Sequence, residues 1–366
     1  MAERMSKQVF VENAKDYKGQ PFSDWLFLVG SIGERTGKTG KGYLALTLKD
    51  RTGELDGRMW DDFAEALAHC KPGSYVRISG RVEEFAGRLQ LVINSLCVED
   101  PARVEPQHFI PHTQYDIGAM DAEVRSVVDG FQNSHLQRLV LSFLDDPRYR
   151  EAFTQAPAAV KNHHAFLGGL LEHVRDLLRV AKAVLPLYPE VHPDLLFSGI
   201  ILHDFGKLME LDWEGGVFRY TTHGELLGHI SIVTGQLRNK IAEVNRAIEQ
   251  EAEALGEKAQ KFPVQLWVLL EHMLLSHHGR LEFGSPKLPM TPEAILLSAL
   301  DDLEAKFAKI RSEFAVKREP EEMTERIFSM ENRRLLNSEA YLRAAGISHR
   351  DSSLSLGLAA EISEPR

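Results

Sequence analysis

Hydrophobic and polar residues alternate along the first hundred residues, with the two-residue period of half-buried strands. Glycine-rich or charged turns separate the alternating stretches, which are residues 25–32, 42–48, 54–60, 75–82 and 89–93. A short stretch with helical spacing, residues 61–67, follows the third of them. Five strands with a helix after the third predict an OB-fold, a small barrel that binds single strands and oligonucleotides on one face.

The pattern changes after this segment. Residues 101–116 contain three prolines and no regular period, which indicates a linker. From Asp121 to about Lys317 the apolar residues recur with helical spacing. Thr222 and Glu225 have the spacing of a capping box at the start of a long helix.

We therefore expect a multidomain α+β protein in which a five-stranded barrel precedes an all-α bundle. The expected segments are an OB-fold nucleic-acid-binding domain at 8–100, a linker at 101–120, a helical domain at 121–340 and a flexible tail at 341–366. A chain of 366 residues is long enough for two domains of ordinary size.

Composition narrows the class of protein. No apolar stretch approaches the roughly 18 residues that would span a bilayer, and the first residues lack the apolar core of a secretory signal. The two cysteines do not suggest a disulfide framework, so we expect a cytoplasmic protein without a membrane partner. The net charge of −10 argues against high non-specific affinity for duplex nucleic acid. It does not argue against an enzyme that binds a few nucleotides.

The strongest candidate for chemistry is the pair His203-Asp204, which ends an apolar run that can only face a core. A histidine and a carboxylate in such a place must be paired, hydrogen-bonded or bound to a metal. Further histidines and acids accompany them along the chain, namely His173, His229, His277-His278 and Asp301-Asp302. Any one of these histidines alone could be a hydrogen-bonded core residue, whereas the ordered set in a helical domain favours a metal site.

The order H…HD…H…HH…D resembles that of the HD-domain metal-dependent phosphohydrolases. Two segments point to one branch of this superfamily. They are the run from His163 to His173 and the segment Ser276-His277-His278-Gly279, which leads into residues 282–286. They look like the YhaM-type 3′–5′ exoribonucleases, a branch in which an N-terminal OB-fold precedes the HD domain. The resemblance covers roughly residues 8–340.

This resemblance implies a set of metal ligands. The four metal-binding positions of HD domains match His173, His203, Asp204 and Asp301. The extra positions of HD proteins that hold two metals match His229 and His277, with Asp204 as the bridge. The implied cofactor is a pair of divalent ions, with Mn²⁺ as the first expectation and Fe, Co, Ni, Mg or Zn as the others.

Other residues are expected to contact the substrate. Lys207 follows Asp204 by three positions, so it could hold a substrate phosphate or the attacking water, although it could equally be an exposed lysine that satisfies helix carbonyls. In the family that this chain resembles, the sequence motif that contains His163 and His164 lies at the rim of the active site. This implies that the two histidines contact the substrate phosphate or the leaving group. We expect His278, as the neighbour of a ligand, to touch phosphate.

The barrel segment interleaves cations with aromatic residues. We expect a strand-binding face to include Phe27, Arg35, Lys38, Lys41, Tyr43, Arg58 and Trp60. Stacking rings and backbone-neutralising cations hold single strands with little sequence preference. For Phe27 and Trp60 the alternative is a place in the barrel core.

These features favour a metal-dependent 3′–5′ exoribonuclease that hydrolyses single-stranded RNA to nucleoside monophosphates. One alternative is an HD-domain phosphohydrolase or phosphodiesterase for a small nucleotide, with a regulatory barrel. Another is an OB-fold nucleic-acid-binding factor whose catalysis is incidental. Single-stranded DNA as a substrate and an oligomeric assembly both stay open from the sequence.

Overall fold

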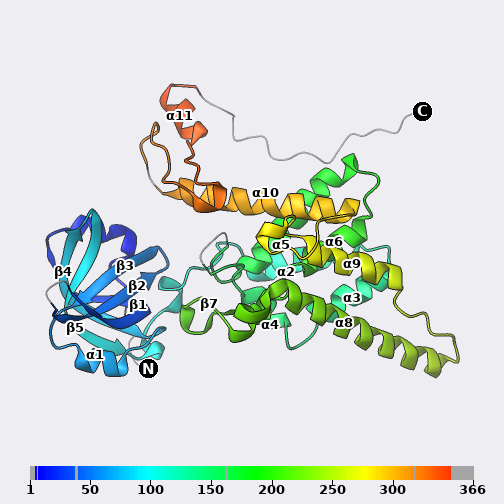
Figure 1. Cartoon of the computed structure of the whole chain (residues 1–366), viewed down its shortest axis with the longest axis horizontal. Helices are drawn as coiled ribbons and strands as arrows, with labels where there is room; N and C mark the ends of the chain where they lie inside the picture. Colours follow the sequence, from blue (N-terminus) through cyan, green and yellow to red (C-terminus); the bar gives the residue numbers. More distant parts are fainter. Residues whose placement is uncertain (1–4, 6, 38–39, 161–163, 317, 348–366) are drawn as a thin grey trace. The chain divides into compact units, whose positions relative to one another are not determined.

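The computed structural model describes residues 5, 7–37, 40–160, 164–316 and 318–347 (Figure 1). The chain forms two compact units, which divide between Glu304 and Ala305. The first contains a barrel, a connecting segment and most of the helices. The second contains the end of one long helix and the residues that follow it.

The N-terminal strands close into a five-stranded barrel, as the alternation of apolar residues predicts. The strands are β1 Pro21–Thr36, β2 Gly42–Asp50, β3 Gly53–Met59, β4 Tyr75–Phe85 and β5 Arg88–Glu99. They pair in the order β1-β2-β3-β5-β4, with β4 closing on β1 and with β3 and β5 parallel. The short helix α1, Ala64–His69, lies between β3 and β4, and a 3₁₀ helix, Val11–Tyr17, precedes β1. The expectation of an OB-fold followed by helices is confirmed.

The barrel interior is filled by the apolar half of each alternating strand. Phe27, Leu44, Leu48 and Leu91 are fully buried there. Side chains at the alternate positions of the same strands point outward, so one set of residues makes the core and the other makes the surface.

The proline-rich connection is ordered. It contains two 3₁₀ turns, Pro101–Arg103 and Pro106–His108, and a proline occupies the first position of each. Phe109 and Tyr75 pack edge to face with ring centroids 5.0 Å apart, within a small apolar cluster beside the barrel.

Helices joined by loops dominate the remaining described chain. The helices are α2 Ile117–Asp129, α3 Ser134–Leu144, α4 Arg150–Gln155, α5 Gly169–Val184, α6 Pro193–Leu202, α7 Lys207–Glu210, α8 Thr222–Leu255, α9 Val264–Ser276, α10 Pro292–Ala315 and α11 Ser338–Ala344. Two short strands, β6 Leu211–Asp212 and β7 Arg219–Tyr220, form a small hairpin between α7 and α8. One apolar core runs through this part of the molecule.

Helix α6 is the centre of that core. Nearly all of its residues from Leu195 to Leu202 are buried, and it packs against α3, α5 and α9. A helix that is apolar all round is stable only when neighbours cover every face. The polar residues that follow it are therefore delivered to the middle of the bundle.

Helix α8 differs from the expected capping box in two respects. Its N-cap is Thr221, one residue earlier than predicted, and the Thr221 hydroxyl accepts a hydrogen bond from the backbone N–H of Gly224. The helix is also interrupted at Gly228, whose φ of 68° is left-handed. The sequence pattern did not reveal this break.

Among the helices that the structure describes, none combines the length and the apolar character that a bilayer span would need.

Candidate metal centre and nucleic-acid face

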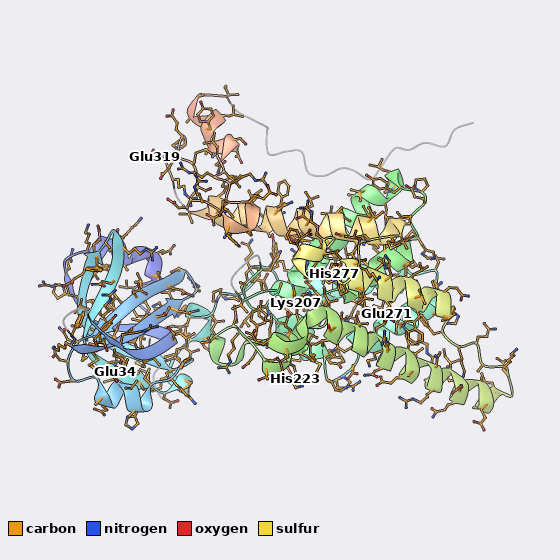
Figure 2. The ribbon with its side chains drawn as sticks, viewed as in Figure 1. Glu34, Lys207, His223, Glu271, His277 and Glu319 are labelled. Atoms are coloured by element: carbon orange, nitrogen blue, oxygen red, sulfur yellow. The ribbon has the colours of Figure 1, made fainter. Side chains whose placement is uncertain are left out.

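The six residues expected to bind metal converge inside the helical part of the molecule, where Figure 2 labels His277 and the nearby Lys207. They are His173 in α5, His203 and Asp204 directly after α6, His229 in α8, His277 directly after α9 and Asp301 in α10. None of the four histidines is more than 9% exposed, and Asp204 is 3% exposed. So many buried polar groups must be paired with one another or must hold a cation.

Asp204 lies in the middle of the cluster, and its two carboxylate oxygens face different pairs of histidines. Oδ2 lies 3.4 Å from Nε2 of His203 and 3.8 Å from Nε2 of His173. Oδ1 lies 3.5 Å from Nε2 of His229 and 3.9 Å from Nε2 of His277. A carboxylate in this position can bridge two cations, with one on each oxygen.

Asp301 completes the group on the Oδ2 side. Its Oδ1 lies 3.2 Å from Nε2 of His173 and 3.8 Å from Nε2 of His203. The two Nε2 atoms are themselves 3.3 Å apart. We call His173, His203, Asp301 and Asp204 Oδ2 the first ligand set, and its atoms are close enough together to surround one ion.

The second ligand set consists of His229, His277 and Asp204 Oδ1. Within the described chain, Nε2 of His229 and Nε2 of His277 are buried and have no hydrogen-bond partner. An unsatisfied buried nitrogen costs on the order of 1–3 kcal/mol, and a metal ion would satisfy both. The donor set, imidazole nitrogens with carboxylate oxygens, fits a divalent transition metal.

His278 was expected to contact substrate, and its position also allows it to bind metal. It offers a nitrogen that lies within 4.8 Å of nitrogens from His229 and His277. Its Nδ1–H donates to the carbonyl oxygen of Phe283 over 2.7 Å, which fixes the ring at the partly exposed edge of the second ligand set.

Helix ends orient two of the metal-facing imidazoles. Nδ1 of His203 donates to the carbonyl oxygen of Ile200 over 2.8 Å, and Nδ1 of His277 donates to that of Leu274 over 2.8 Å. Both carbonyls belong to the last turn of a helix, where they lack a helical partner. Each bond engages Nδ1 and leaves Nε2 directed at Asp204, which is how the ring of a metal-binding histidine is oriented.

Two carboxylates that sequence reasoning missed orient two more imidazoles. Glu304 Oε2 accepts from Nδ1 of His173 over 2.7 Å, and Glu210 Oε1 accepts from Nδ1 of His229 over 3.0 Å. Both glutamates are at least nine-tenths buried. The available signal was the spacing of Glu304 one helical turn after Asp301, which places both on the same face of α10.

The surroundings shift the pKa values of His173 and His277 in opposite directions. Burial opposes a charged imidazole at His173, but hydrogen bonds that the ring donates to Asp301 and Glu304 outweigh it and raise the pKa of His173 to about 10. Around His277 the balance is reversed, because burial and the neighbouring His203 hold the pKa of that ring well below its ordinary value. His277 is therefore neutral at physiological pH, and it can bind an ion without first losing a proton.

Lys207 lies against the bridging carboxylate. Its Nζ is 2.7 Å from Asp204 Oδ2, and its side chain is 13% exposed. Burial opposes both charges, but Lys207 and His203 hold the pKa of Asp204 well below its usual range. Asp204 in turn raises the pKa of the Lys207 ammonium despite burial. The pair is thus charged at neutral pH.

Two glycines allow the loops that carry the candidate ligands to meet. A Cβ on Gly206 would lie 2.2 Å from the carbonyl oxygen of His229, so only glycine lets the loop after α6 contact the start of α8 this closely. The left-handed Gly228 interrupts α8 immediately before His229. These contacts bring His229 beside Asp204.

His164 lies behind the first ligand set instead of at a rim. It is 5% exposed, and its Nε2 lies 3.1 Å from both carboxylate oxygens of Glu304. His173, Glu304 and His164 therefore form a continuous polar chain. His163, which was grouped with it, lies outside the described residues.

On the barrel, the structure corrects the expectation for Phe27. This ring is fully buried and cannot stack on a base, because its position in β1 points into the barrel. Tyr43 and Trp60 are partly exposed and pack on each other with ring centroids 4.6 Å apart. The Arg58 guanidinium lies 5.7 Å from the centre of the Tyr43 ring.

Three further cations were expected on this face. Arg35 is exposed near the end of β1. Lys41 is exposed and forms an ion pair with Asp61 over 2.5 Å. Lys38 lies outside the described residues. The described members thus lie in β1, β2 and β3 or directly beside these strands.

One protein-family model matches the N-terminal part of the chain. Residues 27–98 match the family model described as an OB-fold nucleic acid binding domain. This range corresponds closely to the barrel, and the match supports the nucleic-acid face assigned to it.

Relatives extend over nearly the whole chain. A 3′-5′ exoribonuclease YhaM from Geobacillus sp. (strain WCH70) is 36% identical over 311 residues, which cover 85% of this chain and 90% of that protein. The protein of the same name from Listeria innocua is 34% identical over 323 residues, which cover 88% of this chain and 97% of that protein. A third, from Shouchella clausii, is 35% identical over 315 residues.

Proposed function

Because the chain belongs to the YhaM family of 3′–5′ exoribonucleases, we propose that its cluster of buried histidines and aspartates is the hydrolytic centre. The protein is a 3′–5′ exoribonuclease, a hydrolase that acts on phosphodiester bonds. The proposals below concern the residues that do this, the metal and the path of the substrate.

One observation carries the assignment of the centre: the two oxygens of Asp204 each face a separate pair of imidazole nitrogens. This geometry favours two ions that share one carboxylate. Divalent metals held by these residues would polarise a phosphoryl oxygen as Lewis acids and would lower the pKa of a water molecule. Mn²⁺ is our first expectation, because imidazole with carboxylate ligands keeps it competitive with harder and softer ions.

The chain's own residues position the reacting groups. Glu304 and Glu210 hold the His173 and His229 rings so that Nε2 faces the pocket. The Lys207 ammonium, 2.7 Å from Asp204, can shift to a phosphoryl oxygen and offset the negative charge that builds there during attack. His164 does not contact substrate in this proposal; it holds Glu304 in place.

The barrel binds single-stranded nucleic acid, and we propose that RNA is the strand it delivers to the centre. Tyr43, Trp60 and Arg58 offer adjacent stacking and cationic groups on its outer surface. Such surfaces follow a flexible backbone without needing a duplex. We further propose that the enzyme releases nucleoside monophosphates and works in the cytoplasm.

The test uses a single-stranded RNA labelled at its 5′ end. We expect Mn²⁺-dependent shortening of the labelled strand from its 3′ end, no shortening with excess chelator, and protection by a 3′-phosphate. Asp204→Asn should abolish hydrolysis, whereas Asp302→Asn, a change to the exposed neighbour of a ligand, should preserve it. Cleavage of a circular RNA, or full activity of Asp204→Asn, would refute the proposal.

A further inference from the structure

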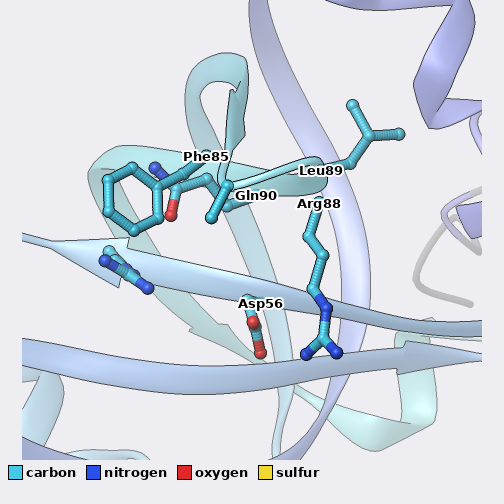
Figure 3. Close-up of a pocket in the computed structure, with 7 residues that line it drawn as sticks. Asp56, Phe85, Arg88, Leu89 and Gln90 are labelled. Atoms are coloured by element: carbon cyan, nitrogen blue, oxygen red, sulfur yellow. The ribbon is translucent and has the colours of Figure 1, made fainter.

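The hairpin between β4 and β5 forms one wall of a pocket on the barrel, and Arg58 is the one lining residue that the account above uses (Figure 3). The pocket has a volume of about 360 Å³, which is within the range that small organic groups occupy. Ala86 and Gly87, both with left-handed φ, make the two-residue turn that closes the hairpin. The turn holds Phe85 and Arg88 opposite each other at the pocket mouth.

One side of the pocket is a stacking surface. Phe85 is 57% exposed, although its ring is large and apolar. The Arg58 guanidinium lies 5.3 Å from the centre of the Phe85 ring and 5.7 Å from that of Tyr43, so it connects the two rings. A nucleobase that stacked on Phe85 would extend an existing series of adjacent planar groups.

Three polar side chains of the pocket have no hydrogen-bond or ion-pair partner among the residues that the structure describes. Gln90 is 7% exposed, and across the described residues its amide makes no hydrogen bond. Nor do Asp56 and Arg88 form an ion pair with any described residue. Figure 3 shows the Asp56 carboxylate and the Arg88 guanidinium directed toward the same side of the pocket. These side chains are therefore available to form hydrogen bonds with a ligand.

The carboxylate decides the kind of ligand. Arg58 and Arg88 line the pocket together with Asp56, so a base edge that carries both N–H donors and an acceptor matches these groups better than a phosphate, which has no N–H to offer the carboxylate. Guanine alone among the four bases presents two adjacent donors, N1–H and N2–H, which match the two oxygens of a carboxylate. The neighbouring O6 of guanine is an acceptor, and arginine is its most frequent partner in proteins.

We propose that this pocket binds one unstacked guanine of the single-stranded RNA, and so gives the barrel a sequence preference at one position. Phe85 stacks on the base, Asp56 accepts from N1–H and N2–H, and Arg88 donates to O6. The proposal rests on the proposed function, because it assumes that RNA passes over the barrel. It adds a specificity that stacking alone does not provide.

The test measures binding by the full-length Asp204→Asn chain, which should leave the strand intact. The strands are twelve-nucleotide oligouridylates that carry a single central guanosine, inosine, adenosine or cytidine. The guanosine strand should bind roughly 5- to 150-fold more tightly than the adenosine and cytidine strands, as one good bidentate contact provides. Inosine, which lacks the 2-amino group, should fall between them.

Adding Asp56→Asn to this chain should remove the preference and leave the affinity for plain oligouridylate within about threefold, since it removes one selective contact. The matched control is Glu84→Gln, which removes one negative charge from strand β4 of the barrel outside the pocket, and which should keep the preference. Equal binding of all four strands by the parent chain, or a preference that survives Asp56→Asn, would overturn the inference. Failure to bind any strand would instead overturn the proposed role of the barrel.

Discussion

At the scale of single residues, the geometry of the site depends on which nitrogen of each imidazole is held by a hydrogen bond and which one faces the centre. Four histidines donate Nδ1–H to a carbonyl or a carboxylate and so direct Nε2 at one central aspartate, Asp204. An imidazole that is fixed in this way binds metal without first reorienting. Lys207 contacts the same aspartate but has no role in fixing the rings.

The first prediction separates Lys207 from the metal ligands. Lys207→Met should lower kcat by roughly 10- to 1000-fold, because it removes one group that stabilises developing charge. Metal content, measured by elemental analysis of the purified protein, should be unchanged. The control is Lys261→Met, which removes an exposed lysine paired with Glu249 and should leave kcat unaltered. Normal kcat in Lys207→Met would show that the ammonium only balances the charge of Asp204.

The second prediction concerns the orienting glutamates. Glu304→Gln and Glu210→Gln should each weaken metal binding by roughly 10- to 100-fold, because the amide holds its histidine less firmly and offers no negative charge. Activity should recover at high metal concentration, which distinguishes a positioning role from a catalytic one. Glu251→Gln, at an exposed carboxylate paired with Arg138, is the control. Unchanged metal affinity in both variants would contradict this role.

Much of the residue-level picture was accessible from the sequence, and the rest depends on three-dimensional contacts. The six expected ligands were recognisable because their order resembles that of a known family. Glu304 and Glu210 were not, since nothing but the folded structure shows which carboxylate meets which Nδ1. Phe27 was misassigned because an aromatic residue in a strand looks the same whether it faces the barrel core or the surface.

At the scale of elements, helix ends and helix breaks bring the ligands together. His203 and His277 follow the last turns of α6 and α9, and His229 follows the break in α8 at Gly228. The strands and most helices were predictable from their apolar periods. The break in α8 was not, because the helical pattern continues on both sides of it.

A third prediction tests the close approach of these elements. Gly206→Ala should lower the Tm and the metal content, because its Cβ would clash with the backbone of His229 at 2.2 Å. Gly235→Ala, in an exposed turn of α8 with open space around the new methyl group, should raise stability by about 0.5–1 kcal/mol. Thermal unfolding monitored by circular dichroism gives both shifts. Equal Tm values for the two variants would show that the contact at Gly206 is unimportant.

At the scale of the whole molecule, the proposal assigns substrate capture and hydrolysis to different parts of the first unit. The described ligands all lie in helices or at their ends, whereas the exposed rings and cations discussed here lie on the barrel. A long strand can use both parts, while a dinucleotide can reach only the metal centre. The two activities should therefore respond to different substitutions.

The fourth prediction follows from this division. Tyr43→Ala should weaken binding of a long single strand by roughly 5- to 150-fold, since one stacked base contributes about 1–3 kcal/mol. Hydrolysis of a dinucleotide should be unaffected. Tyr188→Ala, which removes a partly exposed ring from the helical part, should change neither measurement. Equal losses on long and short substrates in Tyr43→Ala would indicate damage to the fold.

The most direct test of the account is anomalous diffraction from crystals of the full chain grown with Mn²⁺. The account predicts two peaks, about 3.5–4 Å apart as in other two-metal sites, on either side of the Asp204 carboxylate. One should lie among His173, His203 and Asp301, and the other beside His229 and His277. Peaks that are absent, or that lie away from Asp204, would contradict the assignment of this cluster as the hydrolytic centre.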